Sequence, residues 1–384
     1  MVWMKYKLKD IYDLQMGKTP SRNNSEYWNT KENKWISIAD LTKTGKYISE
    51  TKEYLSKSAV LESGIRVIPA DTVVMSFKLS IGKTAITAEN MYSNEAIMAF
   101  HDKHVVDILP EYIYYMFTYK NWDEGSNKAV MGKTLNKAIL SEVEIEICPI
   151  EKQQAIVDVL DKMMLVLEDK ERELSLLDDL IKARFVEMFG DINNNENNWN
   201  CEPLGELCTI VRGGSPRPIE QFLGGDVPWI KIGDATDGDN IYLNSTKEHI
   251  FQEGVKKSRL VKSGSLIFSN CGVSLGFARI ITFDGCIHDG WLAMEDIDVR
   301  LDKVFLLQAL NQMTEHFRAI APAGTQPNLN TAIMKAYKQV IPPIELQKEF
   351  IKFVEQVNKS KVAVQKSLEK TQLLFDSLMQ EYFG

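Results

Sequence analysis

The chain has 384 residues, of which 44% are hydrophobic and 26% charged, and 45 Lys and Arg stand against 53 Asp and Glu, giving a formal net charge of −8. This is the composition of a soluble globular protein with two or three domains, and the acidic total argues against a nucleic-acid binder that works through overall positive charge. The five cysteines show no Cys-x-x-Cys spacing and no run approaches the ~18 apolar residues of a membrane span, so we expect a cytoplasmic protein without disulfide framework, zinc knuckle or membrane insertion.

Residues 1–148 are predicted to form the first globule. Short β-rich runs such as 72–77 are broken by Gly, Pro, Asn and Asp, and one helical stretch follows at 110–119. Trp35 lies in apolar alternation, which is typical of a core residue rather than a base-stacking platform. These features indicate a mixed α/β domain.

Residues 149–190 are predicted to form one long helix. Apolar residues recur at alternating spacings of three and four along a heptad seam, which is interrupted by Lys170 and Arg184. The seam consists of Leu160, Met163, Leu167, Leu174, Leu177, Ile181 and Met188. A helix of ~40 residues is about 60 Å long, and a narrow seam of that length must be buried against a partner.

The second half of the chain repeats the first. An Asn-rich linker at 191–200 leads to a second α/β globule at 201–342 and a second seam helix at 343–384, in which Lys361 and Thr371 interrupt the seam. The opening segment 8–20 is matched by 204–216, and the Trp-Ile-x-Ile-x-Asp run 35–40 by 229–234. The period is about half the chain, which indicates a duplication. We expect the two helices to pair as an antiparallel coiled coil; the alternative is that each packs on its own globule.

No catalytic or metal-binding signature is complete. Three Gly-Lys-Thr triplets lack the earlier glycine that a phosphate-binding loop needs, because those positions hold Tyr12, Phe77 and Asn127. His101 and His104 lack a third ligand at useful spacing, and we interpret them as surface residues. We therefore expect no catalytic residue, no metal and no bound cofactor.

The duplicated layout resembles the DNA specificity (S) subunit of type I restriction-modification systems. The resemblance rests on the repeated segments above, on Gly-Thr-Gln-Pro-Asn-Leu-Asn at 324–330, and on Ile-Pro-Pro-Ile-Glu-Leu-Gln at 341–347. It implies two target-recognition domains that each read one part of a bipartite double-stranded DNA target. It also implies that the helices set the spacer and dock two modification (methyltransferase) subunits, with restriction/translocase subunits beyond. S-adenosylmethionine, ATP and Mg are then expected on the partner subunits.

Candidate DNA contacts are polar or basic residues in glycine-broken loops, and the loops after Gly17 and Gly213 are the first choice. The globules are neutral to mildly acidic, so partner subunits would have to supply much of the phosphate attraction. Two alternatives stay open, namely a coiled-coil scaffold that binds only proteins and a self-contained DNA-modifying enzyme. The candidates are Lys18, Thr19, Ser21, Arg22, Lys78, Lys83, Lys133, Thr134, Arg212, Ser215, Arg217, Asn270, Ser274, Arg279, Thr325, Gln326 and Asn328.

Overall fold

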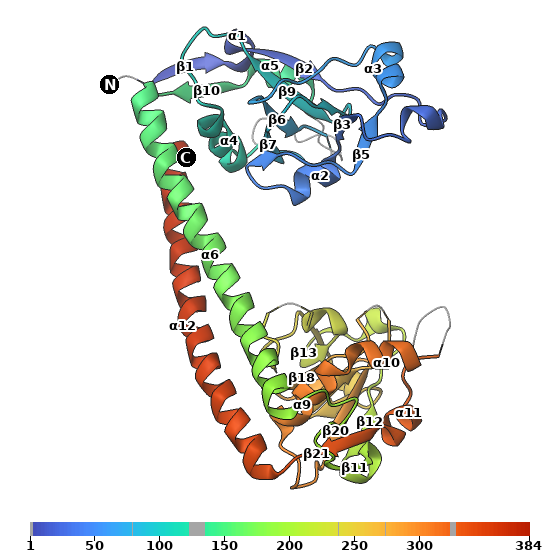
Figure 1. Cartoon of the computed structure of the whole chain (residues 1–384). Coiled ribbons are helices and arrows are strands. Elements are labelled where there is room, and N and C mark those ends of the chain that lie inside the picture. Colours follow the sequence, from blue (N-terminus) through green and yellow to red (C-terminus); the bar gives the residue numbers. More distant parts are fainter. Residues whose placement is uncertain (1–2, 79, 123–134, 237, 273, 323–327) are drawn as a thin grey trace. The chain divides into compact units, whose positions relative to one another are not determined.

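The computed structural model describes residues 3–78, 80–122, 135–236, 238–272, 274–322 and 328–384. The chain divides into two compact units, one formed by 1–169 with 367–384 and the other by 170–366 (Figure 1). Each unit therefore contains one globule and a part of each of two 40-residue helices, α6 (Ile150–Phe189) and α12 (Ile344–Phe383). Within the described ranges, no helix has the length and apolarity that a membrane span requires.

The first globule is built on a five-stranded sheet in the order β2-β9-β6-β7-β4, beside a three-stranded sheet β5-β3-β8. All residues of β6 and β7 are buried, because apolar clusters cover both faces of the large sheet. The helix α4 contributes to the larger of these clusters. The elements are α1 (Leu8–Ile11), β2 (Tyr12–Met16), β3 (Asn33–Ile36), α2 (Ile38–Lys43), β4 (Tyr47–Ile48), β5 (Glu53–Leu55), α3 (Lys57–Ser63), β6 (Val73–Ser76), β7 (Thr84–Thr87), β8 (Tyr92–Ser93), β9 (Ile97–Asp102), α4 (Pro110–Tyr119) and α5 (Lys137–Glu142).

The second globule repeats this topology. Its five-stranded sheet has the order β12-β20-β17-β18-β14, which is the same order with each strand replaced by its counterpart, and a four-stranded sheet β15-β13-β19-β16 lies beside it. The predicted duplication of a mixed α/β domain is thus confirmed. The elements are α7 (Leu204–Leu207), β12 (Thr209–Arg212), β13 (Leu223–Ile230), β14 (Tyr242–Leu243), β15 (Glu248–Ile250), α8 (Gln252–Val255), β16 (Arg259–Val261), β17 (Leu266–Ser269), β18 (Ala278–Ile281), β19 (Gly285–Ile287), β20 (Trp291–Glu295), α9 (Lys303–Gln312), α10 (Thr314–Ile320) and α11 (Thr331–Ala336).

A two-stranded antiparallel sheet closes each globule, and a buried glutamine attaches the long helix that follows. The pairs are β1 (Met4–Lys7) with β10 (Glu144–Ile147), and β11 (Asn200–Pro203) with β21 (Lys338–Ile341). Gln153 accepts a hydrogen bond from the Leu109 N–H at 2.9 Å and donates to the Cys148 carbonyl at 2.8 Å. Gln347 repeats both bonds, with Asp302 and Pro342. Because each amide is fully buried and bonded at both ends, it fixes where the helix leaves its globule.

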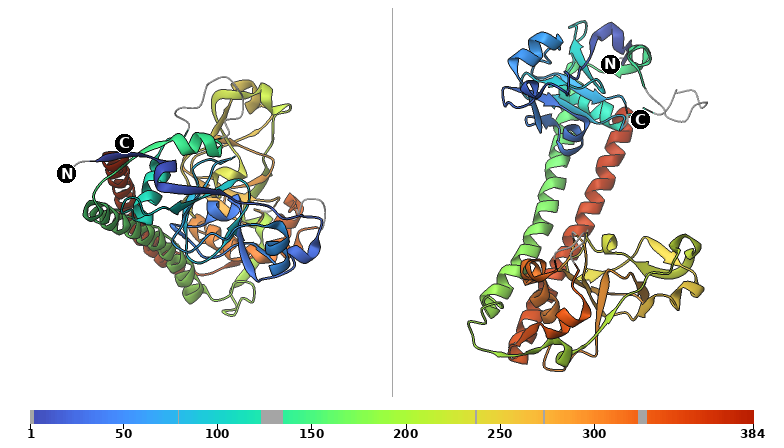
Figure 2. Two further views of the ribbon diagram at one scale, coloured as in Figure 1. Left: turned by 90° about the horizontal axis from the view of Figure 1, so that it is seen from above. Right: turned by 90° about the vertical axis from the view of Figure 1, so that its right-hand side faces the viewer.

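Segments of the two long helices share a core cluster within each unit, and Figure 2 shows the helices running alongside one another. In the first unit, Leu160 of α6 shares a core cluster with Met379 of α12. In the second, Ile181 and Phe185 of α6 share a cluster with Phe350 of α12. The start of one helix therefore meets the end of the other, and the predicted antiparallel pairing is confirmed. Both clusters also include globule residues, so the seam is buried against the globules as well as against the partner helix.

Candidate nucleic-acid interface

A tight crossing of two loops shapes the surface after Gly17 in the first unit. The Lys18 N–H donates to the Ser93 carbonyl at 2.8 Å, and a Cβ on Gly17 would lie 2.2 Å from the Asn94 carbonyl oxygen. Only glycine allows this approach. The crossing brings Thr19 next to Glu95, and the threonine hydroxyl donates a hydrogen bond to the Glu95 carboxylate.

The same crossing occurs after Gly213 in the second unit. The Gly214 N–H donates to the Ile287 carbonyl at 3.0 Å, and a Cβ on Gly213 would lie 2.2 Å from the His288 carbonyl oxygen. Ser215 then donates its hydroxyl to Oδ1 of Asp289 at 2.8 Å. Both globules therefore carry a hydroxyl–carboxylate pair at the same place in the fold.

Two arginines gather around Asp289. The Nε of Arg212 donates to the Asp289 carbonyl at 3.1 Å, and a terminal nitrogen of Arg217 lies 3.6 Å from Oδ2 of Asp289. The Arg217 side chain is 78% exposed. Burial alone would raise the pKa of the Asp289 carboxyl, but the Ser215 hydroxyl and the charges of His288, Arg217 and Arg212 outweigh it and hold the pKa below 3.8. The second unit thus presents an ionised carboxylate beside two guanidinium groups.

The basic residues of the first unit are held more firmly by their own globule. Arg22 forms a two-pronged ion pair with Glu53, and its guanidinium carbon lies 3.7 Å from the centre of the Trp28 ring. Lys18 donates to the Ser63 carbonyl at the end of α3. The Thr19 hydroxyl, helped by the charges of Lys78 and Arg22, lowers the pKa of Glu95. The structure therefore bonds Thr19 to Glu95 and places the charges of Lys78 and Arg22 within electrostatic reach of that carboxylate.

Two candidates predicted to lie in exposed loops are buried, and the prediction is wrong for both. Arg279 is 7% exposed because it lies in β18, and it donates to the Ala278 carbonyl at 2.8 Å and to Oδ1 of Asn240 at 3.3 Å. Asn270 is fully buried at the end of β17, where its amide donates to Oδ1 of Asn328 at 3.0 Å and to the Leu329 carbonyl. Asn270 thus supports the segment that carries Asn328 and does not itself reach the surface.

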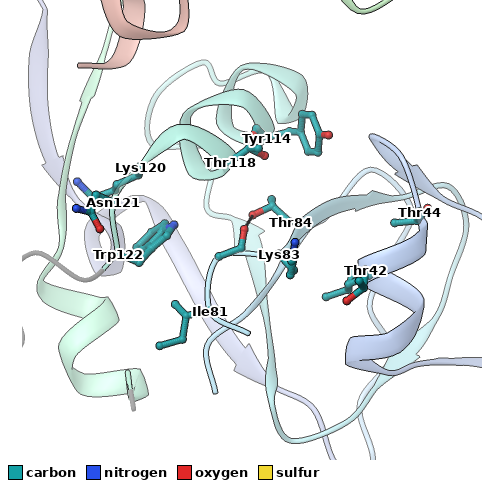
Figure 3. Close-up of a pocket in the computed structure, with 12 residues that line it drawn as sticks. Thr42, Thr44, Ile81, Lys83, Thr84, Tyr114, Thr118, Lys120, Asn121 and Trp122 are labelled. Atoms are coloured by element: carbon teal, nitrogen blue, oxygen red, sulfur yellow. Dashed lines mark hydrogen bonds between the residues drawn. The ribbon is translucent and has the colours of Figure 1, made fainter. Parts of the chain in front are cut away.

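The remaining candidates are dispersed. Ser21 is exposed, and Ser274 is half-buried with its carbonyl bonded to Ser269. Lys83 lies apart from the Gly17 loop, in an open cleft of about 630 Å³ in the first unit that is also lined by Lys120 and Trp122 (Figure 3). Four candidates fall outside the described residues, namely Lys133, Thr134, Thr325 and Gln326.

Glu95, His288 and Asp289 are not among the candidates predicted from the sequence, all of which are basic or neutral polar residues. The repeat itself contained the signal, since aligning the two halves places Asn94-Glu95 opposite His288-Asp289. Among the described residues, no group of three His, Cys, Asp or Glu is arranged to hold a metal ion.

Comparison with known proteins identifies the family. The model of the type I restriction modification DNA specificity domain matches twice, at residues 2–175 and 196–373. The MjaIX specificity subunit of Methanocaldococcus jannaschii is 25% identical over 98% of this chain and 91% of its own length. The EcoR124I/EcoR124II specificity subunit of Escherichia coli is 29% identical over 38% of this chain and 37% of its own length.

Two solved structures share the fold. A chain from a type I R-M system superposes with a TM-score of 0.63 at 16% identity, covering 99% of this chain and 97% of that one. The type I restriction-modification S subunit of M. genitalium superposes with a TM-score of 0.52 at 16% identity, covering 100% and 96%. With both halves matched by one family model, the chain belongs to the type I restriction modification DNA specificity domain family.

Proposed function

We propose that this chain is the non-catalytic, sequence-specific DNA-binding subunit of a type I restriction-modification complex, and that each globule reads one part of a bipartite target. The observation that carries the proposal is the repeated loop crossing, which presents Thr19 with Glu95 in one unit and Ser215 with Asp289 in the other. The backbone crossing is the same in both units, but the neighbouring side chains differ. Arg22 is held by its ion pair with Glu53, whereas the Arg217 side chain is 78% exposed. Two related but unequal surfaces suit two different half-sites.

The long helices would set the spacer between the half-sites and dock the two modification subunits. Both helices carry large apolar side chains that the described chain leaves exposed, for example Leu176 at 57% and Leu373 at 69%. These side chains would supply apolar contacts to a docked modification subunit. S-adenosylmethionine, ATP and Mg, and the restriction/translocase subunits that use ATP, then belong to the rest of the complex.

We expect the purified chain to gain tight sequence-selective DNA binding only with its modification subunit, because its own globules are not basic. Gel shifts with a duplex carrying the target, compared with a scrambled duplex, measure this with and without that subunit. A scaffold that binds only proteins would give no selective shift in either case. A self-contained enzyme would transfer labelled methyl groups from S-adenosylmethionine, or cut the target, without any partner.

Arg217→Ala is expected to weaken recognition of one half-site and to leave the other unchanged. Arg217 is exposed beside Asp289, and a lost base contact costs about 1–3 kcal/mol, or less if the side chain touches phosphate. Binding of the complex to duplexes with either half-site altered separates the two effects. Lys262→Ala, which removes one exposed positive charge from the same unit, is the matched control. Equal loss at both half-sites would contradict the assignment.

A further inference from the structure

We propose that Asp289 and Glu95 are specificity-determining residues, each accepting a hydrogen bond from the exocyclic amino group of one target base, cytosine N4 or adenine N6. The inference rests on the proposed function and deepens it, since it assigns a readout chemistry to two residues at equivalent positions in the repeat. One oxygen of each carboxylate orients a neighbouring hydroxyl, and the other oxygen reads the base.

The two oxygens of Asp289 are differently occupied. Oδ1 receives the Ser215 hydroxyl at 2.8 Å and lies 2.9 Å from Nε2 of His288. Oδ2 has only Arg217 nearby within the described chain, at 3.6 Å, which is longer than a hydrogen bond. The side chain is 35% exposed, so part of it is open to a base edge. A carboxylate oxygen has more than one lone pair, so Arg217 and a base can share it.

The two oxygens of the Glu95 carboxylate are also differently occupied. Thr19 donates to Oε2 and the Glu95 backbone N–H also donates to the carboxylate, while in the part of the chain that the structure describes no hydrogen bond from another side chain reaches Oε1. Glu95 is exposed at the point where the Gly17 loop crosses the strand connection before β9. The Asn94 and His288 carbonyls pack against a glycine in both units, so the backbone that carries each acid is held in place.

A carboxylate on a DNA-binding loop is unfavourable unless it has a specific task, because phosphates repel it. The neighbours of both carboxyls nevertheless stabilise the charged form, since they lower the pKa of each. An ionised carboxylate is only an acceptor, and the amino groups of cytosine and adenine are the major-groove donors that it matches. Nearby positive charges offset the repulsion from the DNA phosphates. These charges are Arg212 and Arg217 beside Asp289, and Lys78 near Glu95.

Asp289→Asn tests the assignment, because the amide keeps the size and one acceptor but adds two donors. We expect the preference for an amino-bearing base at one position of one half-site to fall about 5- to 150-fold, which corresponds to ~1–3 kcal/mol of lost discrimination. The remaining positions and the whole other half-site should be unchanged. Glu95→Gln should do the same in the other half-site.

The measurement is sequencing of random duplexes bound by the chain together with its modification subunit, for the wild type and each variant. The base that the wild type prefers at the affected position shows whether cytosine or adenine is read. Asp284→Asn is the matched control, because Asp284 is exposed in the same unit and pairs with Lys262. Retained recognition of the unaffected half-site shows that the variant is folded.

Two outcomes overturn different claims. If Asp289→Asn weakens binding of all sequences equally, or has no effect on the preferred bases, the carboxylate only supports the loop and this inference fails while the wild type keeps its bipartite target. If the wild-type complex selects no bipartite sequence at all, the proposed function itself fails.

Discussion

Lys361→Met is expected to lower the free energy of unfolding by about 3 kcal/mol, the low end of the range for removing one partner of a buried ion pair. The Lys361 ammonium lies in the second unit, 2.7 Å from Oδ1 of Asp178 on α6 and 3.1 Å from Oδ2 of Asp239 in the globule. The lysine side chain is only 10% exposed, so its loss leaves two carboxylates with the charge of the buried Arg279 as their remaining nearby counter-charge. Because those carboxylates are 16% and 26% exposed, water partly compensates them and the upper end of the range is not reached.

The pH dependence provides a second readout of the same ion pair. Burial disfavours the charged forms of both groups, but hydrogen bonds and opposite charges outweigh it, so the pKa of Asp239 lies below 3.8 and that of Lys361 above 10.5. A carboxyl whose pKa is lowered by folding stabilises the fold at pH values above its unfolded-state pKa, and this stabilisation is lost as the pH falls. A lysine whose pKa is raised by folding stabilises the fold at pH values below its unfolded-state pKa, and this stabilisation is lost as the pH rises. The difference in the free energy of unfolding between wild type and Lys361→Met should therefore be largest between about pH 4 and 10.

Denaturant unfolding of the purified chain at several pH values measures both effects. Lys348→Met is the matched control on α12, since its side chain is 56% exposed and pairs, among the described residues, with Glu345 three residues away, and we expect a change below about 0.5 kcal/mol. An equal effect of both variants, or a difference that is the same at pH 3 and pH 7, would contradict a buried ion pair at Lys361.

Lys361 also illustrates what the sequence predicted and what it did not. The heptad spacing and the repeat predicted two α/β domains and two antiparallel helices, because apolar periodicity depends on local geometry. In the sequence, Lys361 was identified only as a polar interruption of the heptad seam. Its partner Asp239 lies in the globule, far away in sequence, and no local pattern reveals that contact.

The candidate site was also predicted only in part, because contacts between segments that are distant in sequence leave no local pattern. The loops after Gly17 and Gly213 were found because glycine marks a close backbone approach, and Trp35 was correctly interpreted as core at 2% exposure. Arg279 was misplaced because its strand has apolar neighbours on both sides and buries a guanidinium that sequence alone assigns to the surface. The acids Glu95 and Asp289 come from loops that the fold brings to the glycines, so only the alignment of the two halves could have indicated them.

Inserting one heptad into each long helix is expected to lengthen the unspecified spacer of the target by one to three base pairs (estimated from the rise per residue) and to leave both half-sites intact. Both α6 and α12 are continuous helices that pass from one unit into the other, with the unit boundary after Asp169 and after Lys366. Insertion at these two points preserves the a/d register and the contacts that each unit makes with its own helix segments.

The size of the change follows from helix geometry. Seven residues add about 10 Å at 1.5 Å each, which is close to three base pairs at about 3.4 Å. The added DNA also rotates one half-site relative to the other, and bending the duplex can absorb part of that change, so fewer than three base pairs are acceptable.

Methylome sequencing in a host that expresses the variant with its modification subunit measures the spacer directly. Inserting the heptad into α6 alone is the control, because it shifts one seam against the other and should abolish modification. An unchanged spacer in the double variant would mean that the helices do not set it, whereas altered half-site bases would mean that the insertion has disturbed the globules.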